Sequence, residues 1–437
     1  MPKQLEVWLL GSHVGTLMQV DGRPVFAYAA TWLQRAAAGA ATVPLSQSLP
    51  LQAGPFDDRA TRPFFAGLLP EGEKRRLVAK ALQASRQNDF ALLDGIGGEC
   101  AGAVTLLAPG QTPTAPIQHA TVRWLDERAL LHLLDEMPQR PMLAGQEGLR
   151  LSLAGAQDKL PVVVEPAAGN VPLRIGLPLF GAPSTHILKP AIAGVDGSVF
   201  NEAFCMTLAG ALKLPVAPAQ IQRVAGRTVL LVQRYDRVPS TDAAGAVQPA
   251  RLHQEDFCQA MGVPPEHKYQ NEGGPDLAQC FALLRRATRP SAPHTLALLD
   301  LVVFNALIGN HDAHGKNFSL LYGPAGTGLA PLYDALCTAA YPQLTDKMAM
   351  KLGGKYRFSE VMARHWEQFA RDAGLSPAQV KKRVIDIARR LPDMAHQIRA
   401  GFEAHGYGSP VLSRIVALVE RRCALTLRRL TDTSTSA

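Results

Sequence analysis

Short apolar runs separated by turn residues mark the first part of the chain. Runs typical of strands lie at residues 4–9, 14–20, 24–28 and 101–107. Gly11-Ser12 and Asp21-Gly22 supply turns between the first three runs. The intervening region 63–94 is rich in Leu, Ala, Lys and Arg and predicts helix. This part of the chain is therefore expected to be β-rich with some helix.

A mixed pattern follows a Pro- and Thr-rich segment at 108–120, which predicts a linker. Strand-like runs lie at 159–165, 185–190 and 228–235. Helix-like runs lie at 124–136 and 200–213. Residues 237–250 have few large apolar side chains and predict a second loop. Together these elements indicate a small α/β lobe.

Helical periodicity dominates after residue 253. The predicted helices lie at 254–261, 276–289, 294–308, 359–373, 376–391, 393–404 and 410–430. Only 318–322 and 329–333 are typical of strands, and the tail TDTSTSA is expected to be disordered. The pattern predicts an α+β chain in three parts: a β-rich part over 1–110, an α/β lobe over 121–236 and a helical lobe over 237–437.

The charge balance favours an acidic partner. The 437 residues carry a formal net charge of +8, with a pI of about 9.2, which suits nucleic acid or a phosphorylated ligand. The basic residues are densest near the C-terminus, at Lys381, Lys382, Arg383, Arg389, Arg390, Arg421, Arg422, Arg428 and Arg429. Solvated helix faces are the simpler interpretation of this cluster, with a nucleic-acid patch as the alternative.

The cysteine pattern and the hydropathy favour a cytoplasmic protein. The six cysteines contain no C-x-x-C pair, which argues against a disulfide framework or a zinc site and fits a reducing compartment. The N-terminal run MPKQLEVWLLGSHVG is interrupted by a glycine–serine turn and does not resemble a signal peptide. No apolar stretch approaches the roughly 20 residues of a membrane span, so no membrane partner is expected.

The strongest chemical signal is NHDAHGKNFSLLYGPAGTGLAPLYDA, residues 310–335. Asn317 follows Asp312 by five residues, and Asp334 lies seventeen further on. Phosphoryl transfer from ATP needs a carboxylate for the attacking hydroxyl and oxygen ligands for Mg²⁺. Asp312 is therefore the candidate catalytic base, and Asn317 and Asp334 are the candidate magnesium ligands.

The surroundings of these residues support that interpretation. An apolar helix over 298–310 ends in Gly309-Asn310, which are stop signals, and the polar loop follows at once. Asp334 comes after two strand-like runs joined by a glycine-rich turn. A helix, a catalytic loop, a hairpin and a metal aspartate are the parts of a kinase catalytic segment in this order.

Other interpretations of the loop are weaker. Capping a helix or turn is the commonest role of residues such as Asp312 and Asn317, but His314 and Lys316 lie in the same loop and extend the set of candidate nucleotide contacts. Zinc at His311 and His314 is disfavoured, because no third nitrogen or sulfur ligand is nearby.

A second candidate site is LSLAGAQDKLPVVV, residues 151–164. Small residues let backbone N–H groups approach phosphate oxygens. The candidate nucleotide contacts here are Ser152, Ala154, Gly155, Ala156, Gln157 and Lys159. The segment lacks the G-x-x-x-x-G-K-[ST] pattern, so an ordinary tight turn is the alternative.

Three further positions are candidates for binding the nucleotide. Lys189 ends an apolar strand and would point its ammonium into an interlobe cleft, towards the α- and β-phosphates. Glu202 on the next helix would pair with it, although a helix N-terminal charge is the simpler interpretation. Gln233 and Tyr235, in VQRYDR, are candidates for backbone contacts with adenine at a hinge.

These segments together resemble the HipA family, the serine/threonine-kinase toxins of HipA–HipB toxin–antitoxin modules. The resemblance implies a protein-kinase-like two-lobed fold, with an α/β N-lobe, an all-helical C-lobe and an appended β-rich N-terminal subdomain. It rests on PLSQSLPLQ (44–52), AGAQDK (154–159), THILKP (185–190), NEAFCM (201–206), QRYDR (233–237), RLHQEDFCQAMG (251–262), KYQNEGGP (268–275), DAHGKNFS (312–319) and PLYDA (331–335).

By position, the resemblance implies that Asp312 is the catalytic aspartate and Lys189 the nucleotide lysine. It implies ATP and Mg²⁺ as cofactors, with the metal on Asn317 and Asp334. Ser152 lies where the family carries an autophosphorylated serine, and phosphorylation there would add charge and expel the loop. Some relatives carry Glu at the position of Gln233, a change that backbone contacts would survive.

The resemblance also implies partners and a substrate. The partner would be a small helix-turn-helix antitoxin of the HipB type, with operator DNA contacted through it. The substrate would be a cytoplasmic translation protein, first an aminoacyl-tRNA synthetase such as glutamyl-tRNA synthetase, whose modification would arrest growth. Two alternatives stay open. A small-molecule or lipid kinase shares D-x-H-x-x-N, and a non-catalytic DNA-associated regulator would suit the net charge.

Overall fold

The computed structural model describes residues 3–40, 42–113, 122–167, 173–224, 226–241 and 247–431, apart from the side chains of residues 247 and 248. The chain forms two compact units. Unit 1 comprises Met1–Pro190, Gln222–Pro265 and Leu321–Ala325. Unit 2 comprises Ala191–Ile221, Glu266–Leu320 and Gly326–Ala437. The three-part division at residues 110, 121 and 237 stays a prediction.

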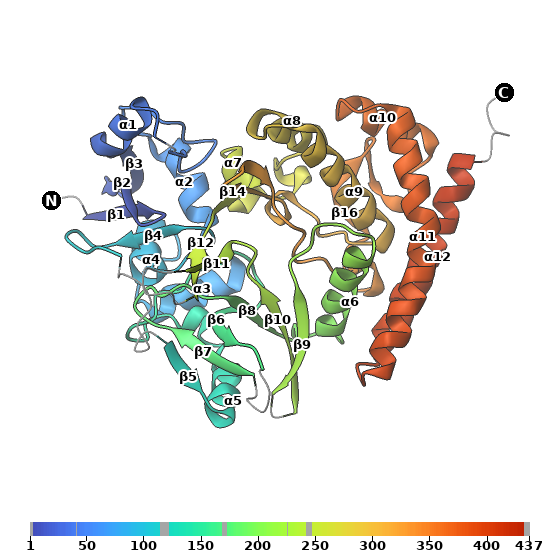
Figure 1. The fold of residues 1–437 in the computed structure, drawn as a ribbon, viewed down its shortest axis with the longest axis horizontal. Helices are drawn as coiled ribbons and strands as arrows, with labels where there is room; N and C mark the ends of the chain where they lie inside the picture. Colours follow the sequence, from blue (N-terminus) through green and yellow to red (C-terminus); the bar gives the residue numbers. More distant parts are fainter. Residues whose placement is uncertain are drawn as a thin grey trace. The chain divides into compact units, whose positions relative to one another are not determined.

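An antiparallel sheet of four strands, in the order β3-β2-β1-β4, opens unit 1 (Figure 1). Its strands are β1 (Lys3–Leu9), β2 (Ser12–Val20), β3 (Arg23–Tyr28) and β4 (Val104–Leu107). Alternate residues of β1 are buried, as the period-two pattern predicted. Phe26, Phe64 and Phe65 are fully buried in the core beneath this sheet.

Helices fill the chain between β3 and β4. They are α1 (Ala30–Ala37), α2 (Asp58–Gly67), α3 (Gly72–Ala81) and α4 (Asp89–Ile96). The predicted helical region 63–94 is thus three helices with breaks between them. Capping explains two of their starts, because the side chains of Asp57 and Asn88 accept hydrogen bonds from Ala60 N–H and Ala91 N–H.

A six-stranded sheet with the order β5-β7-β6-β8-β10-β9 forms a second core. Its strands are β5 (Val122–Leu125), β6 (Leu160–Glu165), β7 (Arg174–Pro178), β8 (His186–Pro190), β9 (Ala219–Val224) and β10 (Arg227–Gln233). Helix α5 (Glu127–Glu136) contributes to the same core. The predicted strands β6, β8 and β10 are confirmed. Strands β7 and β9 were not predicted, because the former contains Gly and Pro and the latter alternates only weakly.

Two predictions in the rest of unit 1 need correction. The predicted loop 237–250 carries the paired strands β11 (Arg237–Thr241) and β12 (Val247–Arg251), although residues 242–246 lie outside the described residues. Most of β11 is exposed, so no hydrophobic alternation marked it. The predicted helix 254–261 is strand β13 (His253–Asp256) followed by a single turn, α7 (Phe257–Ala260). The predicted linker is described only as far as residue 113, without helix or strand.

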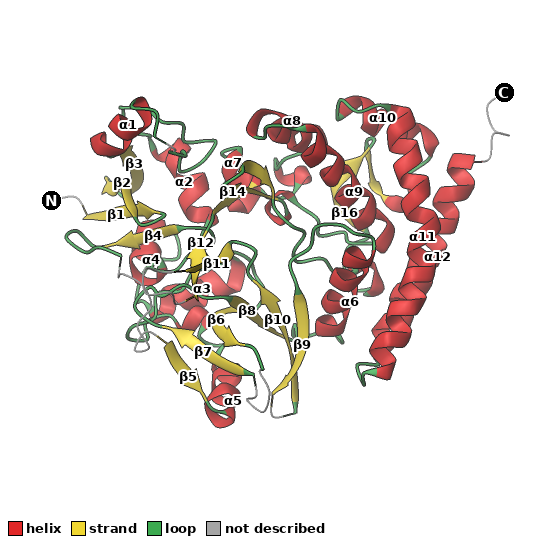
Figure 2. Cartoon of the chain, in the orientation of Figure 1, coloured by secondary structure: helices red, strands yellow, loops and turns green. Residues whose placement is uncertain are grey.

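Unit 2 is mainly helical, as Figure 2 shows for the C-terminal region. Its helices are α6 (Ser198–Ala211), α8 (Leu277–Ala287), α9 (Ala292–Ile308), α10 (Ala363–Asp372), α11 (Pro377–Ala404) and α12 (Pro410–Thr431). Every residue of α9 from Leu298 to Ile308 is buried, which fits its apolar sequence on all faces. The long helices α11 and α12 pack side by side.

The predicted all-helical character of the C-terminal lobe is wrong in detail. A hairpin of β16 (Lys347–Leu352) and β17 (Lys355–Arg357) lies in unit 2, turned by Gly353 and Gly354 at positive φ. The strand predicted at 318–322 is β14 (Ser319–Gly323). The strand predicted at 329–333 is wrong, because β15 (Gly326–Leu329) ends where it was expected to begin. The helices predicted at 376–391 and 393–404 are one helix, because α11 continues through Pro392.

None of the described helices is both long enough and apolar enough to cross a membrane.

Candidate active site

The end of α9 places the candidate catalytic loop. Gly309 has φ +77 and ends the helix, and the N–H of Asn310 donates to the carbonyl of Asn305 at 2.9 Å. The Asn310 side chain donates to Asn305 Oδ1 at 2.9 Å and accepts from the N–H of Asp312 at 3.1 Å. The Asn310 side chain thus links the end of α9 to the backbone N–H of Asp312 and fixes the position of that residue.

A tyrosine holds the Asp312 carboxylate. The Tyr269 hydroxyl donates to Asp312 Oδ1 at 2.6 Å, and the Tyr269 ring meets the His314 ring edge-on, with 5.1 Å between centroids. Asp312 itself is exposed. The carboxylate is therefore oriented by the protein and accessible to an acceptor hydroxyl, as a general base must be.

We expect Tyr269→Phe to lower the turnover number for phosphoryl transfer about tenfold while leaving the KM for ATP unchanged. A hydrogen bond to a charged group contributes about 1.5–3 kcal/mol, and this one restrains the carboxylate, not the nucleotide. Steady-state kinetics check it, with Tyr356→Phe as the matched tyrosine control. An unchanged turnover number would show that Tyr269 does not orient Asp312.

The rest of the loop is buried. His314, Lys316 and Asn317 are 6%, 8% and 7% exposed. Burial, aided by the Lys268 and Lys316 cations, lowers the pKa of His314 well below its usual range, so the imidazole is neutral near neutral pH. Its Nδ1 is buried and has no hydrogen-bond partner among the described residues. This ring nitrogen is a polar group that a bound ligand would satisfy.

A second tyrosine ties the segment before Asp334 to the same loop. The Tyr333 hydroxyl donates to the carbonyl of Lys316 at 2.7 Å and lies 2.7 Å from Ser319 Oγ. Asp334 follows with φ +57, a left-handed conformation that Asp tolerates better than most residues. The hydrogen bond between Tyr333 and Lys316 therefore joins the residue before Asp334 to the residue before Asn317. Asn317 and Asp334 both present oxygen atoms, which suit a hard cation such as Mg²⁺.

His311 has a structural role that the sequence did not reveal. Its ring bonds the carbonyl of Thr345 through Nδ1 at 2.9 Å and Arg422 Nη2 through Nε2 at 3.0 Å. Since Arg can only donate, Nε2 accepts and Nδ1 carries the proton. The backbone N–H of His311 donates to Thr338 Oγ1 at 2.8 Å. Both ring nitrogens are engaged in holding the loop.

Arg422 reaches this loop from α12. Its guanidinium donates to the carbonyl of Ala306 at 3.2 Å and lies over the Phe358 ring, 4.2 Å from the centroid. Burial lowers the pKa of Arg422 to about 10, so the side chain is still charged at neutral pH. A C-terminal helix thus supports the residue next to Asp312.

In unit 1, the small-residue segment, here called the phosphate turn, forms isolated bridges at residues 151 and 155 and bends at residues 156 and 157. The Ser152 side chain is fully buried, and its hydroxyl donates to the carbonyl of Leu68 at 2.8 Å. Gly155 has φ +108, which glycine adopts without strain, and its carbonyl accepts the N–H of Glu71 at 3.1 Å. Lys159 Nζ donates to the carbonyl of Ala154 at 2.9 Å. The segment thus has one glycine at positive φ, with the Lys159 ammonium close beside it.

The remaining candidates of unit 1 lie on β8, at the end of β10 and just after it. Lys189 is 5% exposed and is paired in register with Leu230. Gln233 is exposed, and the Tyr235 hydroxyl donates to Gln254 Oε1. Glu202 is buried on α6, and its pairing with Lys189 stays a prediction.

Each unit thus gathers its own share of the sequence-predicted site residues. Unit 2 holds Asp312, His314, Lys316, Asn317 and Asp334, and unit 1 holds Ser152, Ala154, Gly155, Ala156, Gln157, Lys159, Lys189, Gln233 and Tyr235. Four residues that support the loop were not predicted from the sequence in that role: Tyr269, His311, Tyr333 and Arg422. Tyr269 lies in KYQNEGGP and Tyr333 in PLYDA, so those quoted motifs were the only signal for them.

Comparison with known proteins decides the family. A model described as the HipA-like C-terminal domain matches residues 151–395, and one described as the HipA N-terminal domain matches residues 5–107. The chain belongs to the HipA family. It is therefore a kinase with the kinase-like fold of HipA, built as α+β.

Individual relatives of this HipA-family chain agree with that assignment. Y4mE of Sinorhizobium fredii, a proposed kinase, is 49% identical over 386 residues, covering 88% of this chain and 89% of its own. The serine/threonine-protein kinase toxin HipA of Shewanella oneidensis is 28% identical over 397 residues, covering 85% and 86%. The structure of Shewanella oneidensis MR-1 HipA with HipB and operator DNA has a TM-score of 0.80 at 24% identity, covering 99% and 100%.

Proposed function

We propose that this HipA-family chain is an ATP- and magnesium-dependent serine/threonine protein kinase that acts as the toxin of a HipA–HipB-like module. The observation that carries the proposal is the Asp312 carboxylate, held by Tyr269 at 2.6 Å and exposed to an acceptor. Asn317 and Asp334 belong to the same tethered segment. A carboxylate base beside two oxygen ligands is the arrangement that phosphoryl transfer requires.

The residues fit these cofactors. When bound, ATP with Mg²⁺ supplies the phosphoryl group and neutralises the charge that develops during its transfer. Asn317 and Asp334 would hold the metal, and the buried His314 Nδ1 would gain a polar partner. In unit 1, Lys189 and the turn that includes Ser152, Ala154, Gly155, Ala156, Gln157 and Lys159 would hold the phosphates. The backbone of Gln233 and Tyr235 would hold adenine.

Asp312 carries the proton step in this proposal. Its carboxylate orients the acceptor Ser or Thr hydroxyl through the oxygen that Tyr269 leaves accessible, and accepts the hydroxyl proton as the oxygen attacks phosphorus. Lys316, buried at 8% exposure, adds positive charge to the loop. The imidazole of His314 stays neutral because burial lowers its pKa, and it therefore contributes a hydrogen bond without a charge.

The proposed partners follow from the relatives. The Shewanella oneidensis structure is a complex of HipA with HipB and its operator DNA. We extend this to a HipB-like helix-turn-helix antitoxin for the present chain, with operator DNA contacted through it. The proposed substrate is a cytoplasmic translation protein, first an aminoacyl-tRNA synthetase such as glutamyl-tRNA synthetase. Incubation of purified kinase with ATP, Mg²⁺ and candidate synthetases, followed by mass spectrometry, tests this choice.

Self-inactivation through Ser152 is part of the same proposal. The Ser152 side chain is fully buried, with its hydroxyl on the carbonyl of Leu68. A phosphate adds about −1.5 to −2 charges and does not fit that position. Phosphorylation therefore requires the turn over 151–155 to leave its place, and the added charge would prevent its return.

We expect ATP and Mg²⁺ to add one phosphate to the purified chain, at Ser152, and amides 150–156 to exchange faster in the modified form. Intact mass, peptide mapping and hydrogen exchange measure this. Ser152→Ala and Asp312→Asn should each remain unmodified. A phosphate at another residue with Ser152 unmodified would remove the switch from the proposal, whereas loss of all phosphorylation and ATP binding would remove the kinase assignment itself.

A further inference from the structure

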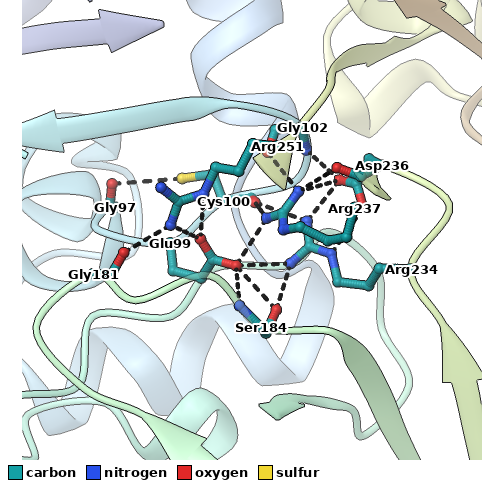
Figure 3. Close-up of polar contacts among 10 residues, drawn as sticks. All are labelled: Gly97, Glu99, Cys100, Gly102, Gly181, Ser184, Arg234, Asp236, Arg237 and Arg251. Atoms are coloured by element: carbon teal, nitrogen blue, oxygen red, sulfur yellow. Dashed lines mark hydrogen bonds and ion pairs between the residues drawn. The ribbon is translucent and has the colours of Figure 1, made fainter. Parts of the chain in front are cut away.

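Five charged side chains, four of them buried, form one cluster in unit 1, here called the ionic hub. Its members are Glu99, Arg234, Asp236, Arg237 and Arg251 (Figure 3). Four of the five are between 1% and 6% exposed, and Arg251 is partly buried. Three cations and two anions give the hub a formal charge of +3 − 2 = +1. Residues 233 and 235 were predicted from the sequence only as a hinge for adenine, and none of the five hub residues is among the predicted site residues.

The Glu99 carboxylate lies at the centre of the hub. Figure 3 shows it flanked by Arg251 on one side and by Ser184 and Arg234 on the other. Oε2 accepts from Arg251 Nε at 3.0 Å. Oε1 accepts from Arg237 at 2.8 Å, from Arg234 at 3.1 Å, and from the N–H and hydroxyl of Ser184 at 3.0 and 2.9 Å. Burial alone would raise the pKa of Glu99, but Arg237, Arg251 and Arg234 hold it well below its usual range.

Asp236 forms the other half of the hub and holds the backbone around Glu99. Its carboxylate accepts from Arg234 Nε at 2.9 Å and from the N–H of Gly102 at 2.7 Å. In return, Arg234 donates to the carbonyl of Cys100 at 3.0 Å and Arg237 donates to the carbonyl of Gly102 at 2.9 Å. The hinge side chains therefore fix the segment 99–102 through both its side chain and its backbone.

The backbone of Glu99 holds the start of the phosphate turn. Its N–H donates to the carbonyl of Arg150 at 2.7 Å, and its carbonyl accepts the N–H of Ser152 at 2.9 Å. The same residue thus binds the hinge through its carboxylate and the turn through its peptide groups. Within the hinge, the N–H of Arg234 donates to the carbonyl of Thr185 at 3.0 Å, next to β8.

The hinge residues differ in burial. Arg234, Asp236 and Arg237 are buried in the hub, whereas Gln233 is exposed and Tyr235 is half-buried. Residues 235 and 236 lie in a turn, and the N–H of Arg237 donates to the carbonyl of Arg234 at 3.3 Å. Fixing the arginines and the aspartate therefore sets where the backbone groups of residues 233 and 235 lie.

We propose that Glu99 and the ionic hub are positioning elements for the nucleotide, holding the phosphate turn and the adenine hinge in one geometry. This rests on the proposed function, and it gives residues 97–102, which fall in the region matched by the HipA N-terminal domain, a part in nucleotide binding. Directional bonds between charged groups fix distances more closely than an apolar contact does. The hub does not include the catalytic loop, so it sets nucleotide affinity and not the proton step.

Glu99→Gln and Arg251→Gln in the full chain test this proposal. Arg251 is at the rim of the hub, with a side chain 19% exposed, so its variant is the one expected to fold if Glu99→Gln does not. The control is Glu165→Gln, which breaks an exposed ion pair with Arg174 in the same unit. Both hub variants should raise the KM for ATP at least about tenfold, with the turnover number at saturating ATP within about twofold, and should speed exchange of amides 150–156 by about tenfold or more.

The two readouts separate the hub from the proposed activity. If wild type neither binds ATP nor transfers phosphate, the kinase proposal fails, yet faster exchange of 150–156 and 233–237 in the hub variants still supports the positioning role. A folded Arg251→Gln variant with wild-type exchange in both segments and an unchanged KM would overturn it. So would a fall in turnover number at an unchanged KM, because the hub would then act on the chemistry and not on nucleotide geometry.

Discussion

Replacement of Asp312 by Asn should reduce phosphoryl transfer at least about a thousandfold, while the chain still folds and binds ATP. Asp312 is exposed, so the substitution buries no new group. The amide keeps the shape of the carboxylate and can still accept from Tyr269, but it cannot accept the proton of the acceptor hydroxyl. General-base catalysis contributes about 10²–10⁴ in rate, and the loss of negative charge also weakens acceptor orientation.

Single-turnover transfer from labelled ATP to the chain itself or to a protein substrate measures the effect, with ATP affinity measured in parallel. Asp393→Asn, an exposed aspartate on α11, is the matched control and should behave as wild type. A rate within tenfold of wild type for Asp312→Asn would show that another group accepts the proton. If the variant lost both ATP binding and phosphoryl transfer, Asp312 would instead belong to the ATP-binding site.

The secondary structure around the candidate catalytic loop was predictable from sequence because its signals are local. The apolar helix, the Gly309 stop and the hairpin after the loop follow each other within a few dozen residues, and each has a strong short-range signal. The strands of the first sheet were equally clear, since their alternation matches the burial of β1. The HipA resemblance joined such segments in the right order, and the family models confirm it.

The residues that support the site, by contrast, could not be predicted from local sequence patterns. Tyr269 meets Asp312 across 43 residues, Arg422 meets His311 across 111, and Arg251 meets Glu99 across 152. Pattern reasoning sees periodicity along the chain, and contacts at such separations depend on how the elements pack. Strand β11 was missed for a different reason: most of its residues are exposed, so it has no apolar alternation to detect.

A second large effect is expected at Glu255, a buried acid without a cation partner among the groups that bind it. It is 1% exposed, and its carboxylate accepts from the Ser46 hydroxyl, from Gln47 N–H at 3.0 Å and from the Tyr322 hydroxyl at 2.5 Å. Burial raises the pKa of Glu255 to about 7, and these three donors only partly oppose the shift. Because an unfolded glutamate titrates near 4.3–4.5, the folded chain holds a proton here that the unfolded chain has lost.

The sign of the pH dependence follows from that difference. Stability falls with rising pH wherever the folded state binds more protons than the unfolded state. The contribution of Glu255 is therefore fully present below about pH 4.5 and is lost as the pH rises to about 7. His253, stacked on Tyr322, opposes it below pH 6.5, because burial lowers the pKa of His253 to about 4. Wild type alone would thus hide much of the effect.

Comparison with Glu255→Gln removes the contribution of His253, which both proteins share. Relative to wild type, the variant should gain roughly 2–3 kcal/mol of unfolding free energy between pH 5 and pH 8. Urea titration read by hydrogen exchange of β1–β3 follows the part of unit 1 that packs near Ser46, and Glu165→Gln is the exposed control. A difference that stays constant with pH would mean that Glu255 is ionised throughout, and that Ser46, Gln47 and Tyr322 stabilise a buried carboxylate instead of a protonated acid.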